Sequence, residues 1–446
     1  MSTVNLLATG RSTFVKEAGN SVNRRARALL SQLGAELHGP EQLVEFAAGA
    51  RFERSPGGVD ILLCATFADA SVAEAAFGDS PGPVILWAVR DPAPEGERLY
   101  LNSLCGANLA AHALVRRGVP VRLVYGNPEE AAVEATLKNL LDPAQDPVAQ
   151  ALKRLRGSVI GVIGEAPAGF TTCEYDAGWL ERSLGLGVTT LSLESAFERI
   201  GAVPAERRQA VAAATAERSP SLLEIPVAQV DLFAATATAL EDWAVSERLA
   251  ALALRCWPEF PLQLGACPCS ALGRLSSGGV ATACEADVNG AATMLLIQAL
   301  APEAGPTYLA DVVRVDEAAN TVTFWHCGLA PVELAADPEH PRQDLHCNRG
   351  IGVAGNFALR AGRLTIARIS HSREGYRLLL SGGEALAGAN RFKGNSVDVR
   401  LDTDAAEFVR TVVERGFEHH TVLAWAELRP QLRRAAQQLG LPLVEC

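Results

Sequence analysis

The chain has 446 residues, of which 48% are hydrophobic, and it carries 51 acidic against 40 basic side chains. A chain of this length and hydrophobic content can bury several cores, so it is not a disordered protein as a whole. Its negative net charge gives no electrostatic reason to bind a phosphate backbone, and we expect no nucleic-acid partner.

The sequence carries no signal for a membrane. It has no apolar run of about 18 residues, so we expect no membrane-spanning helix and no membrane partner. The first twenty residues lack the basic and apolar segments of a signal peptide, which makes a cytoplasmic location the expectation. Ten cysteines without a CxxC pair are expected to be reduced and buried. A metal site at the Cys-Pro-Cys run 267–269 is a minor alternative, because this spacing suits a shared tetrahedral ion poorly.

The first third of the chain alternates short apolar runs with helical patterns. The expected strands are 4–9, 59–65, 84–89 and 121–125, and the expected helices are 24–33, 102–117 and 128–141. Such alternation is typical of a parallel sheet with helices on both faces. Arg11 follows the first strand at its carboxyl end, where open α/β sheets bind ligands, so it is a candidate for substrate binding, with a simple turn as the alternative.

A second α/β unit is expected to begin with the strand 158–163, whose following loop lacks the GxGxxG dinucleotide pattern. A long helix is expected over 230–255. Beyond about residue 303, short β-like runs at 321–325, 353–359 and 364–369 precede an expected amphipathic helix, 423–439. We therefore predict an α/β protein of three domains. Two are open, doubly wound parallel-sheet domains (1–154 and 155–302), and the third is a smaller β-rich domain (303–446).

Two acidic residues stand inside apolar runs. Glu285 lies in ATACEA, where a buried carboxylate must be paired or bind a metal. Asp311 lies in the strand-like run YLADVVRV, with a turn at a strand edge as the alternative. Asp287 directly precedes an expected helix, so capping and ligand binding both stay open for it.

Three histidines complete the set of candidate ligands. His326 ends an expected strand, and His419 and His420 are expected just before the last helix, with ordinary core or surface histidines as the alternative. Two carboxylates with two or more imidazoles suit a divalent ion, and imidazole shifts the preference from Mg²⁺ toward Mn²⁺ or Co²⁺. We predict a Mn²⁺ site where the second and third domains meet.

Four motifs in the last part of the chain resemble one known family. They are CEADVNGA at 284–291, LAD at 309–311, HCGLAP at 326–331 and HHT at 419–421. In order and spacing they are similar to motifs of the L-fucose and L-arabinose isomerases, which are metal-dependent aldose–ketose isomerases, over residues 250–446.

The resemblance implies roles for these residues. Glu285 and Asp311 would bind the metal and also act as acid and base. His420 would complete the metal shell, with His326 as a further imidazole, and His419 would contact the substrate.

The resemblance also implies a homo-oligomer whose active site lies near a subunit interface. Arg11 or Trp87 would then reach the substrate of a neighbouring subunit, with a core position as the alternative for Trp87. Asn289 and Gln263 are further candidates for sugar binding, with packing as the alternative for Gln263.

The expected reaction interconverts an aldose and its ketose through a cis-enediol. The substrate would be a pentose, a 6-deoxyhexose or an anionic sugar such as sulfoquinovose. Arg391 and Lys393, in a basic loop, are candidates for binding an anionic group, with a solvated turn as the alternative. A non-catalytic sugar-binding or regulatory protein that uses the same cleft is the alternative function.

Overall fold

The computed structural model describes residues 2–67, 69–141 and 146–446. Contacts divide the chain into two compact units, Met1–Asp146 and Pro147–Cys446. Within the second unit a single hydrophobic core extends through both a parallel and a β-rich sheet, and the domain boundary expected at 302 stays a prediction. None of the helices in the described ranges has the length and apolar character that crossing a membrane requires.

The first unit is a five-stranded sheet in the order β2-β1-β3-β4-β5, with every pairing parallel. Its strands are β1 (Ser2–Thr9), β2 (Ala35–His38), β3 (Val59–Cys64), β4 (Val84–Ala88) and β5 (Val121–Tyr125). Its helices are α1 (Lys16–Gln32), α2 (Ala70–Phe77), α3 (Ser103–Arg116) and α4 (Ala131–Leu141), with a short turn at η1 (Ala47–Gly49).

Both faces of this sheet are covered. Adjacent residues of a strand point to opposite faces, and Leu6 and Leu7 of β1 are both fully buried. Leu6 belongs to a core with side chains of α1 and α4, whereas Leu7 belongs to a core with side chains of α2 and α3. The predicted open parallel sheet with helices on both faces is therefore confirmed.

The second unit begins with a parallel sheet in the order β7-β6-β8-β9. Its strands are β6 (Val159–Ile163), β7 (Gly187–Leu191), β8 (Leu249–Leu254) and β9 (Ala281–Cys284). The helices of this part are α5 (Pro147–Leu155), α6 (Ala177–Trp179), α7 (Leu193–Gly201), α8 (Ala205–Arg218), α9 (Val227–Ser246), α10 (Cys269–Ser277) and α11 (Val288–Leu300). Short turns are η3 (Thr171–Cys173), η4 (Leu180–Leu184), η5 (Pro220–Glu224), η6 (Phe260–Leu264) and η7 (Pro302–Ala304).

The rest of the second unit is β-rich, as predicted. The strands are β10 (Tyr308–Asp316), β11 (Thr321–His326), β12 (Gln343–Leu345), β13 (Val353–Gly355), β14 (Phe357–Ala358), β15 (Gly362–Ser372), β16 (Gly375–Ala385), β17 (Asn395–Leu401), β18 (His420–Ala424) and β19 (Leu443–Glu445). The helices are α12 (Ala405–Glu414) and α13 (Arg429–Leu439), with a turn at η8 (Val332–Leu334). Eight strands form one sheet, β14-β17-β11-β10-β18-β15-β16-β19, and a further pairing of β16 with β17 closes six of them into a ring.

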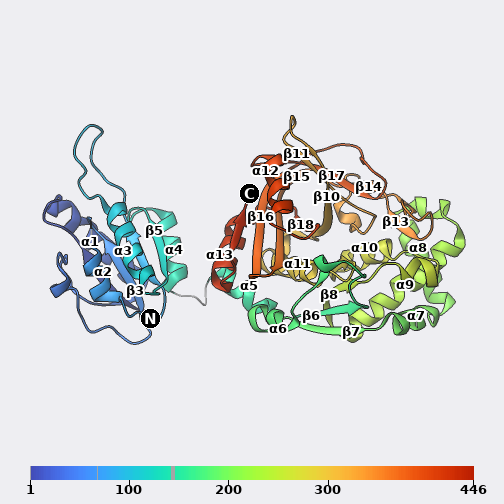
Figure 1. Cartoon of the computed structure of the whole chain (residues 1–446), viewed down its shortest axis with the longest axis horizontal. Coiled ribbons are helices and arrows are strands. Elements are labelled where there is room, and N and C mark those ends of the chain that lie inside the picture. The colour runs from blue at the N-terminus through green and yellow to red at the C-terminus, as the bar shows by residue number, and fades with distance from the viewer. Residues whose placement is uncertain (1, 68, 142–145) are drawn as a thin grey trace. The chain divides into compact units, whose positions relative to one another are not determined.

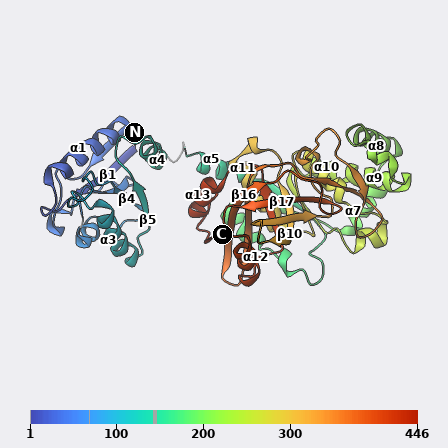
Figure 2. The same ribbon diagram turned by 90° about the horizontal axis from the view of Figure 1, so that it is seen from above.

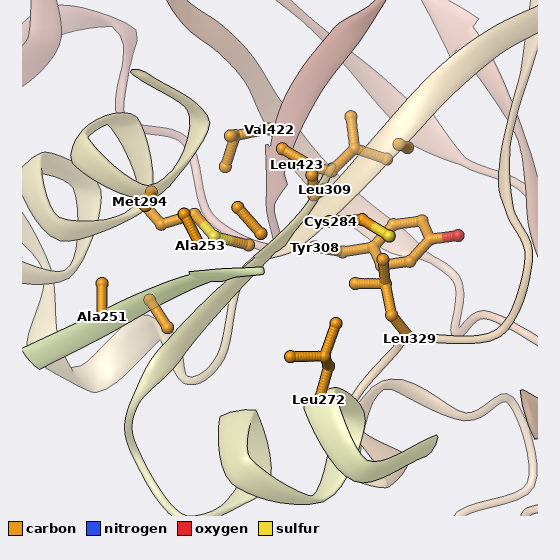
Figure 3. Close-up of a cluster of buried hydrophobic side chains, with 14 of the residues drawn as sticks. Ala251, Ala253, Leu272, Cys284, Met294, Tyr308, Leu309, Leu329, Val422 and Leu423 are labelled. Atoms are coloured by element: carbon orange, nitrogen blue, oxygen red, sulfur yellow. The ribbon is translucent and has the colours of Figure 1, made fainter. Parts of the chain in front are cut away.

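Helix α11 joins the two sheets. Its residues 288–297 are all buried, and it contacts β8 and β9 of the parallel sheet as well as β15 and β18 of the ring (Figure 1). Figure 3 shows Met294 of α11 beside Ala251 and Ala253 of β8, with Leu423 of β18 in the same cluster. Helices α8 and α9 lie at the end of this unit opposite α13 (Figures 1 and 2). The two sheets and α11 thus share one hydrophobic core.

Two predicted helices are shorter in the structure. Instead of a helix over 230–255, α9 ends at Ser246 and β8 follows, because Arg248 adopts a left-handed φ of 54° that reverses the chain. Instead of a helix over 423–439, residues 420–424 form β18, and α13 begins at Arg429. A short apolar run is compatible with a buried strand or with a helix. Residues 420–424 form a strand because they pair with β10 on one side and with β15 on the other.

Candidate active site

The turn between β9 and α11 carries two of the predicted acidic residues. Glu285 and Ala286 both have left-handed backbone conformations, with φ of 60° and 57°. This conformation costs about 1–2 kcal/mol per non-glycine residue, and such strain is typical of functional sites. Asp287 then caps α11 by accepting a hydrogen bond from the amide of Gly290 at 2.8 Å. The turn therefore places two carboxylates at the junction of the two sheets.

The ring of strands supplies the other predicted residues. In the antiparallel pairing of β10 and β18, Asp311 lies directly opposite His420. Residues opposite each other in adjacent strands project to the same face. His420 is 1% exposed, so its imidazole is almost entirely inside the protein.

One nitrogen of His420 lies between the two carboxylates. Its Nε2 atom is 3.8 Å from Oε2 of Glu285 and 3.7 Å from Oδ1 of Asp311. In an octahedral shell with bonds of about 2.1 Å, ligand atoms are about 3 Å apart when adjacent and about 4.2 Å when opposite. Both Nε2 of His420 and Oδ1 of Asp311 are buried without a hydrogen-bond partner among the described residues. Ligand atoms of Asp311, His419 and His420 lie within 4.8 Å of one another, and so do those of Cys173, Glu285 and His420. His420 therefore belongs to two groups of side chains that could bind a divalent cation.

A buried ion pair fixes the orientation of His420. Nδ1 of His420 lies 3.0 Å from Oδ2 of Asp287, and Arg368, which is fully buried, binds the same carboxylate through two nitrogens at 2.5 and 2.9 Å. Burial raises the pKa of Asp287, but the charge and hydrogen bonds of Arg368 together with those of His420 hold this pKa well below its usual range. The ionised carboxylate accepts the Nδ1 proton, which leaves the lone pair of Nε2 free to bind a metal.

His326 has the opposite arrangement of its ring. Its Nδ1 atom accepts a hydrogen bond from the backbone amide of Cys327 at 2.8 Å, so a neutral ring carries its proton on Nε2. Nε2 is buried without a described partner. These features suit a hydrogen-bond donor better than the predicted metal ligand.

His419 contacts the first carboxylate directly. Its Nε2 atom lies 3.0 Å from Oε2 of Glu285, and Nε1 of Trp257 donates to Oε1 of the same carboxylate at 3.4 Å. Burial raises the pKa of Glu285, but the hydrogen bond from His419 and the nearby imidazole of His420 lower it below 4.5. The side chain of His419 is 36% exposed. Glu285 is therefore ionised and lies next to a group that reaches solvent.

Glu285, Asp311 and His326 border a cavity of about 170 Å³, whereas His419 and His420 are not among its lining residues. Carboxylates and imidazoles form one part of its lining, cysteines form a second part, and a short polar loop forms the third. The lining residues are Cys256, Trp257, Pro261, Cys267, Pro268, Cys269, Cys284, Glu285, Asp311, Trp325, His326, Cys327, His346, Asn348 and Arg349. The cavity thus places two acidic groups, two imidazoles and one arginine around a space of the size of a small molecule.

Comparisons with known proteins identify the family. Sulfoquinovose isomerase from Alkalicoccus urumqiensis is 36% identical over 451 residues, covering 100% of this chain and 99% of the relative. The chain belongs to the sulfoquinovose isomerase family. Family members from Priestia megaterium (34% identical, 99% of this chain and 98% of the relative) and Clostridium sp. strain MSTE9 (31%, 84% and 83%) also match. No family model matches the chain. The expectation of an enzyme of carbohydrate metabolism, an aldose–ketose isomerase, is confirmed.

Not all predicted residues of this sulfoquinovose isomerase homologue lie at the cavity. Trp87 is fully buried in the core of the first unit, where Nε1 donates to the carbonyl of Gly126 at 3.0 Å, which is the core position that was its alternative. Asn289 is also fully buried and binds the carbonyl of Glu174 and the hydroxyl of Tyr376, so it braces the loop before α6 instead of reaching the cavity.

The other two predicted substrate contacts are at the surface. Gln263, in η6, is exposed and is not among the lining residues of the cavity. Arg11, on the loop after β1, pairs with Asp69 at 3.4 Å, and its contact with a substrate stays a prediction.

Sequence reasoning missed two arginines of this site. Arg368 stands in the apolar strand run TIARIS. A charged residue inside an apolar run also marked Asp311 as a candidate, so the sequence could have indicated Arg368 in the same way. Arg349 lies on a polar loop after β12 and has no comparable signal. The two predicted basic candidates are engaged elsewhere, Arg391 with Asp398 and Lys393 with Asp344.

Proposed function

We propose that the protein is a metal-dependent isomerase that interconverts sulfoquinovose and its ketose. The observation that carries the proposal is the position of Nε2 of His420, unsatisfied and within 3.8 Å of both Glu285 and Asp311. The names of the relatives support the sugar. The resemblance to L-fucose and L-arabinose isomerases, and a homo-oligomer with the site near a subunit interface, are parts of the same proposal.

Glu285, Asp311 and His420 would hold the ion. Carboxylate oxygens with one imidazole favour Mn²⁺, with Co²⁺ and Mg²⁺ as alternatives. Such an ion would stabilise the negative charge that develops on O1 and O2 of the sugar. His326 stays outside this set, because the proton that its neutral ring carries on Nε2 leaves no lone pair there for an ion.

The side chains divide the proton transfers between them. In the direction from aldose to ketose, one carboxylate removes the proton from C2 while a second group gives a proton to O1, and a cis-enediol results. The O2 proton then leaves and C1 takes up a proton, so that the number of protons is unchanged. Glu285 is ionised and suits the base, and Asp311 on the other side of His420 suits the second group. His419 holds Glu285 in place, and Nε2 of His326 donates to a substrate oxygen.

A cationic side chain supports an anionic substrate. Arg349, an exposed residue, lines the same cavity as the carboxylates, and no ion pair is found for it in the described part of the chain. Sulfoquinovose carries a sulfonate on C6 that is negative at every physiological pH. A pentose or a 6-deoxyhexose would leave this arginine without a counter-charge, so we prefer the sulfonated sugar.

The test combines metal removal with a panel of sugars. Protein stripped of metal by a chelator is expected to be inactive, and added Mn²⁺ is expected to restore isomerisation of sulfoquinovose above that of glucose, L-fucose and L-arabinose. In heavy water, NMR is expected to detect deuterium at C1 or C2. Full activity without metal would contradict the metal site, and a preference for an uncharged sugar would contradict the substrate. Isomerisation without deuterium uptake would contradict exchange with solvent during proton transfer.

A further inference from the structure

Half of the cysteines surround one cavity. All ten are free thiols, and Cys256, Cys267, Cys269, Cys284 and Cys327 line the active-site cavity. The isomerisation proposed above uses none of them. Since thiols are soft ligands for metal ions, this cluster is a candidate metal site.

Three ligand groups converge within the cluster. Cys269, Cys327 and His346 each offer one ligand atom, and these atoms lie within 4.8 Å of one another. The sulfurs of Cys269 and Cys327 are 3.6 Å apart. A tetrahedral ion with Zn–S bonds of about 2.3 Å places two sulfurs about 3.8 Å apart, whereas a disulfide joins them at about 2.05 Å. The observed spacing is too long for a disulfide, and it suits two ligands of one ion as well as a thiol–thiol hydrogen bond.

Separate elements hold the three residues in place. Cys269 is the first residue of α10, Cys327 follows β11, and His346 follows β12. The amide of His346 donates to the carbonyl of Gly352 at 3.0 Å, which closes the loop that carries the histidine. A Cβ at Gly352 would lie 2.2 Å from the backbone nitrogen of Cys267, so only glycine allows this loop to approach the Cys-Pro-Cys run.

The ring of His346 can join the two sulfurs at small cost. Its Nδ1 atom accepts a hydrogen bond of 3.2 Å from the amide of Asn348, so the proton of the neutral ring stays on Nε2. Coordination through Nδ1 would exchange this long hydrogen bond for a bond to the ion.

We propose that Cys269, Cys327 and His346 form a second metal site, which binds a zinc-class ion in the wall of the active-site cavity. Two thiolates and one imidazole select Zn²⁺, whereas the carboxylates around His420 select a harder ion. Three protein ligands leave the fourth tetrahedral position to water or to a further donor. The ion would also anchor the loop that carries Arg349. This inference does not rest on the proposed sugar substrate.

Cobalt distinguishes the two sites by colour. Full-length, reduced and metal-free protein is titrated with Co²⁺. Tetrahedral cobalt bound to thiolate gives a sulfur-to-metal charge-transfer absorption and intense visible bands, which a carboxylate and imidazole shell does not give. We expect these bands to saturate at one ion per chain and to disappear when Zn²⁺ is added. A reduced wild-type protein that gives no charge-transfer band with Co²⁺ overturns the proposal.

Variants assign the absorption to residues. Cys269→Ser and Cys327→Ser are expected to abolish the charge-transfer band, and His346→Gln is expected to weaken cobalt binding. Cys105→Ser, which changes an exposed thiol of the first unit, and His420→Ala are expected to retain the band. A band that persists in the double variant Cys269→Ser/Cys327→Ser also overturns the proposal. Circular dichroism checks that each variant is folded. If a variant misfolds, the cobalt titration of the wild-type protein alone tests whether the thiolate site exists.

Discussion

Nδ1 of His420 lies 3.0 Å from Oδ2 of Asp287, whose carboxylate also binds the fully buried guanidinium of Arg368. One carboxylate thus neutralises a buried cation, orients an imidazole and caps α11. From the sequence alone, a capping role was one of two possibilities for Asp287. In the structure Asp287 caps the helix and its carboxylate also contacts His420 and Arg368. The stability of the second unit and the metal affinity of His420 therefore depend on the same side chain.

Replacing Asp287 tests this dependence. Asp287→Asn leaves Arg368 without its main counter-charge, and we expect the free energy of unfolding to fall by about 3–5 kcal/mol. Loss of a partner that orients a metal-binding histidine is expected to lower metal affinity roughly 10- to 100-fold. Urea unfolding and metal titration measure the two effects.

A matched control separates capping from the ion pair. Asp404 caps α12 through the amide of Glu407 at 2.8 Å and contacts neither an arginine nor a histidine in the described structure. Since asparagine caps helices as well as aspartate does, Asp404→Asn should change neither quantity. Equal effects of the two substitutions would show that Asp287 acts only as a cap.

Two stacked histidines are expected to have different roles. The rings of His326 and His420 lie 5.4 Å apart, but only His420 has a free lone pair on Nε2. We expect His420→Ala to reduce metal affinity by more than the roughly 10- to 100-fold typical of an outer partner. His326→Gln should keep the metal while kcat falls about 10²- to 10³-fold, as for loss of one donor to a developing negative charge. Elemental analysis and steady-state kinetics provide the comparison, and metal loss in His326→Gln would instead make His326 a ligand, as the sequence predicted.

The pairing of His419 with Glu285 predicts a pH dependence of stability in the metal-free protein. Burial alone would lower the pKa of His419, but the hydrogen bond to Glu285 and the carboxylate of Asp311 raise it above 6.5. A group with a raised pKa stabilises the fold fully below its unfolded value and loses this contribution as the pH rises through the folded value. The free energy of unfolding should therefore decline from about pH 6.5 upward.

The same pair acts in the opposite direction at low pH. The lowered pKa of Glu285 contributes stability that is lost as the pH falls through the folded value, below about pH 4.5. In urea unfolding across this range, His419→Gln should flatten the alkaline decline, and His340→Gln, at an exposed site, should not. An unchanged alkaline slope in His419→Gln would contradict the assignment.

The sequence predicted the elements of the fold better than their pairing. β5 has the predicted bounds, 121–125, because Gly118 and Gly126 enclose a short apolar run. The pairing of Asp311 with His420 depends on the register of β10 against β18, which no local pattern determines. The last two residues of β18, 423 and 424, were predicted as the start of a helix, since a short apolar run suits both structures.

The candidate site divides in the same way. Glu285 and Asp311 were found because a carboxylate in an apolar run needs a partner, and the structure brings both to His420. The role of His326 depends on the backbone amide of Cys327, which sequence cannot place. The approach of Cys269 to His346 was missed because only local cysteine spacing was considered, whereas these residues come from separate elements.

The last prediction concerns recognition of the sulfonate. Arg349, after β12, lines the cavity without a carboxylate partner in the described ranges, whereas Arg342, directly before β12, pairs with Glu224 at 2.7 Å. We expect Arg349→Gln to lower kcat/KM for sulfoquinovose about 10- to 100-fold, as for loss of a hydrogen bond to a charged group. Any slow turnover of glucose should be unchanged, because glucose has no anionic group. Arg342→Gln should affect neither sugar, and an equal loss for both sugars in Arg349→Gln would indicate a structural role for the loop instead of charge recognition.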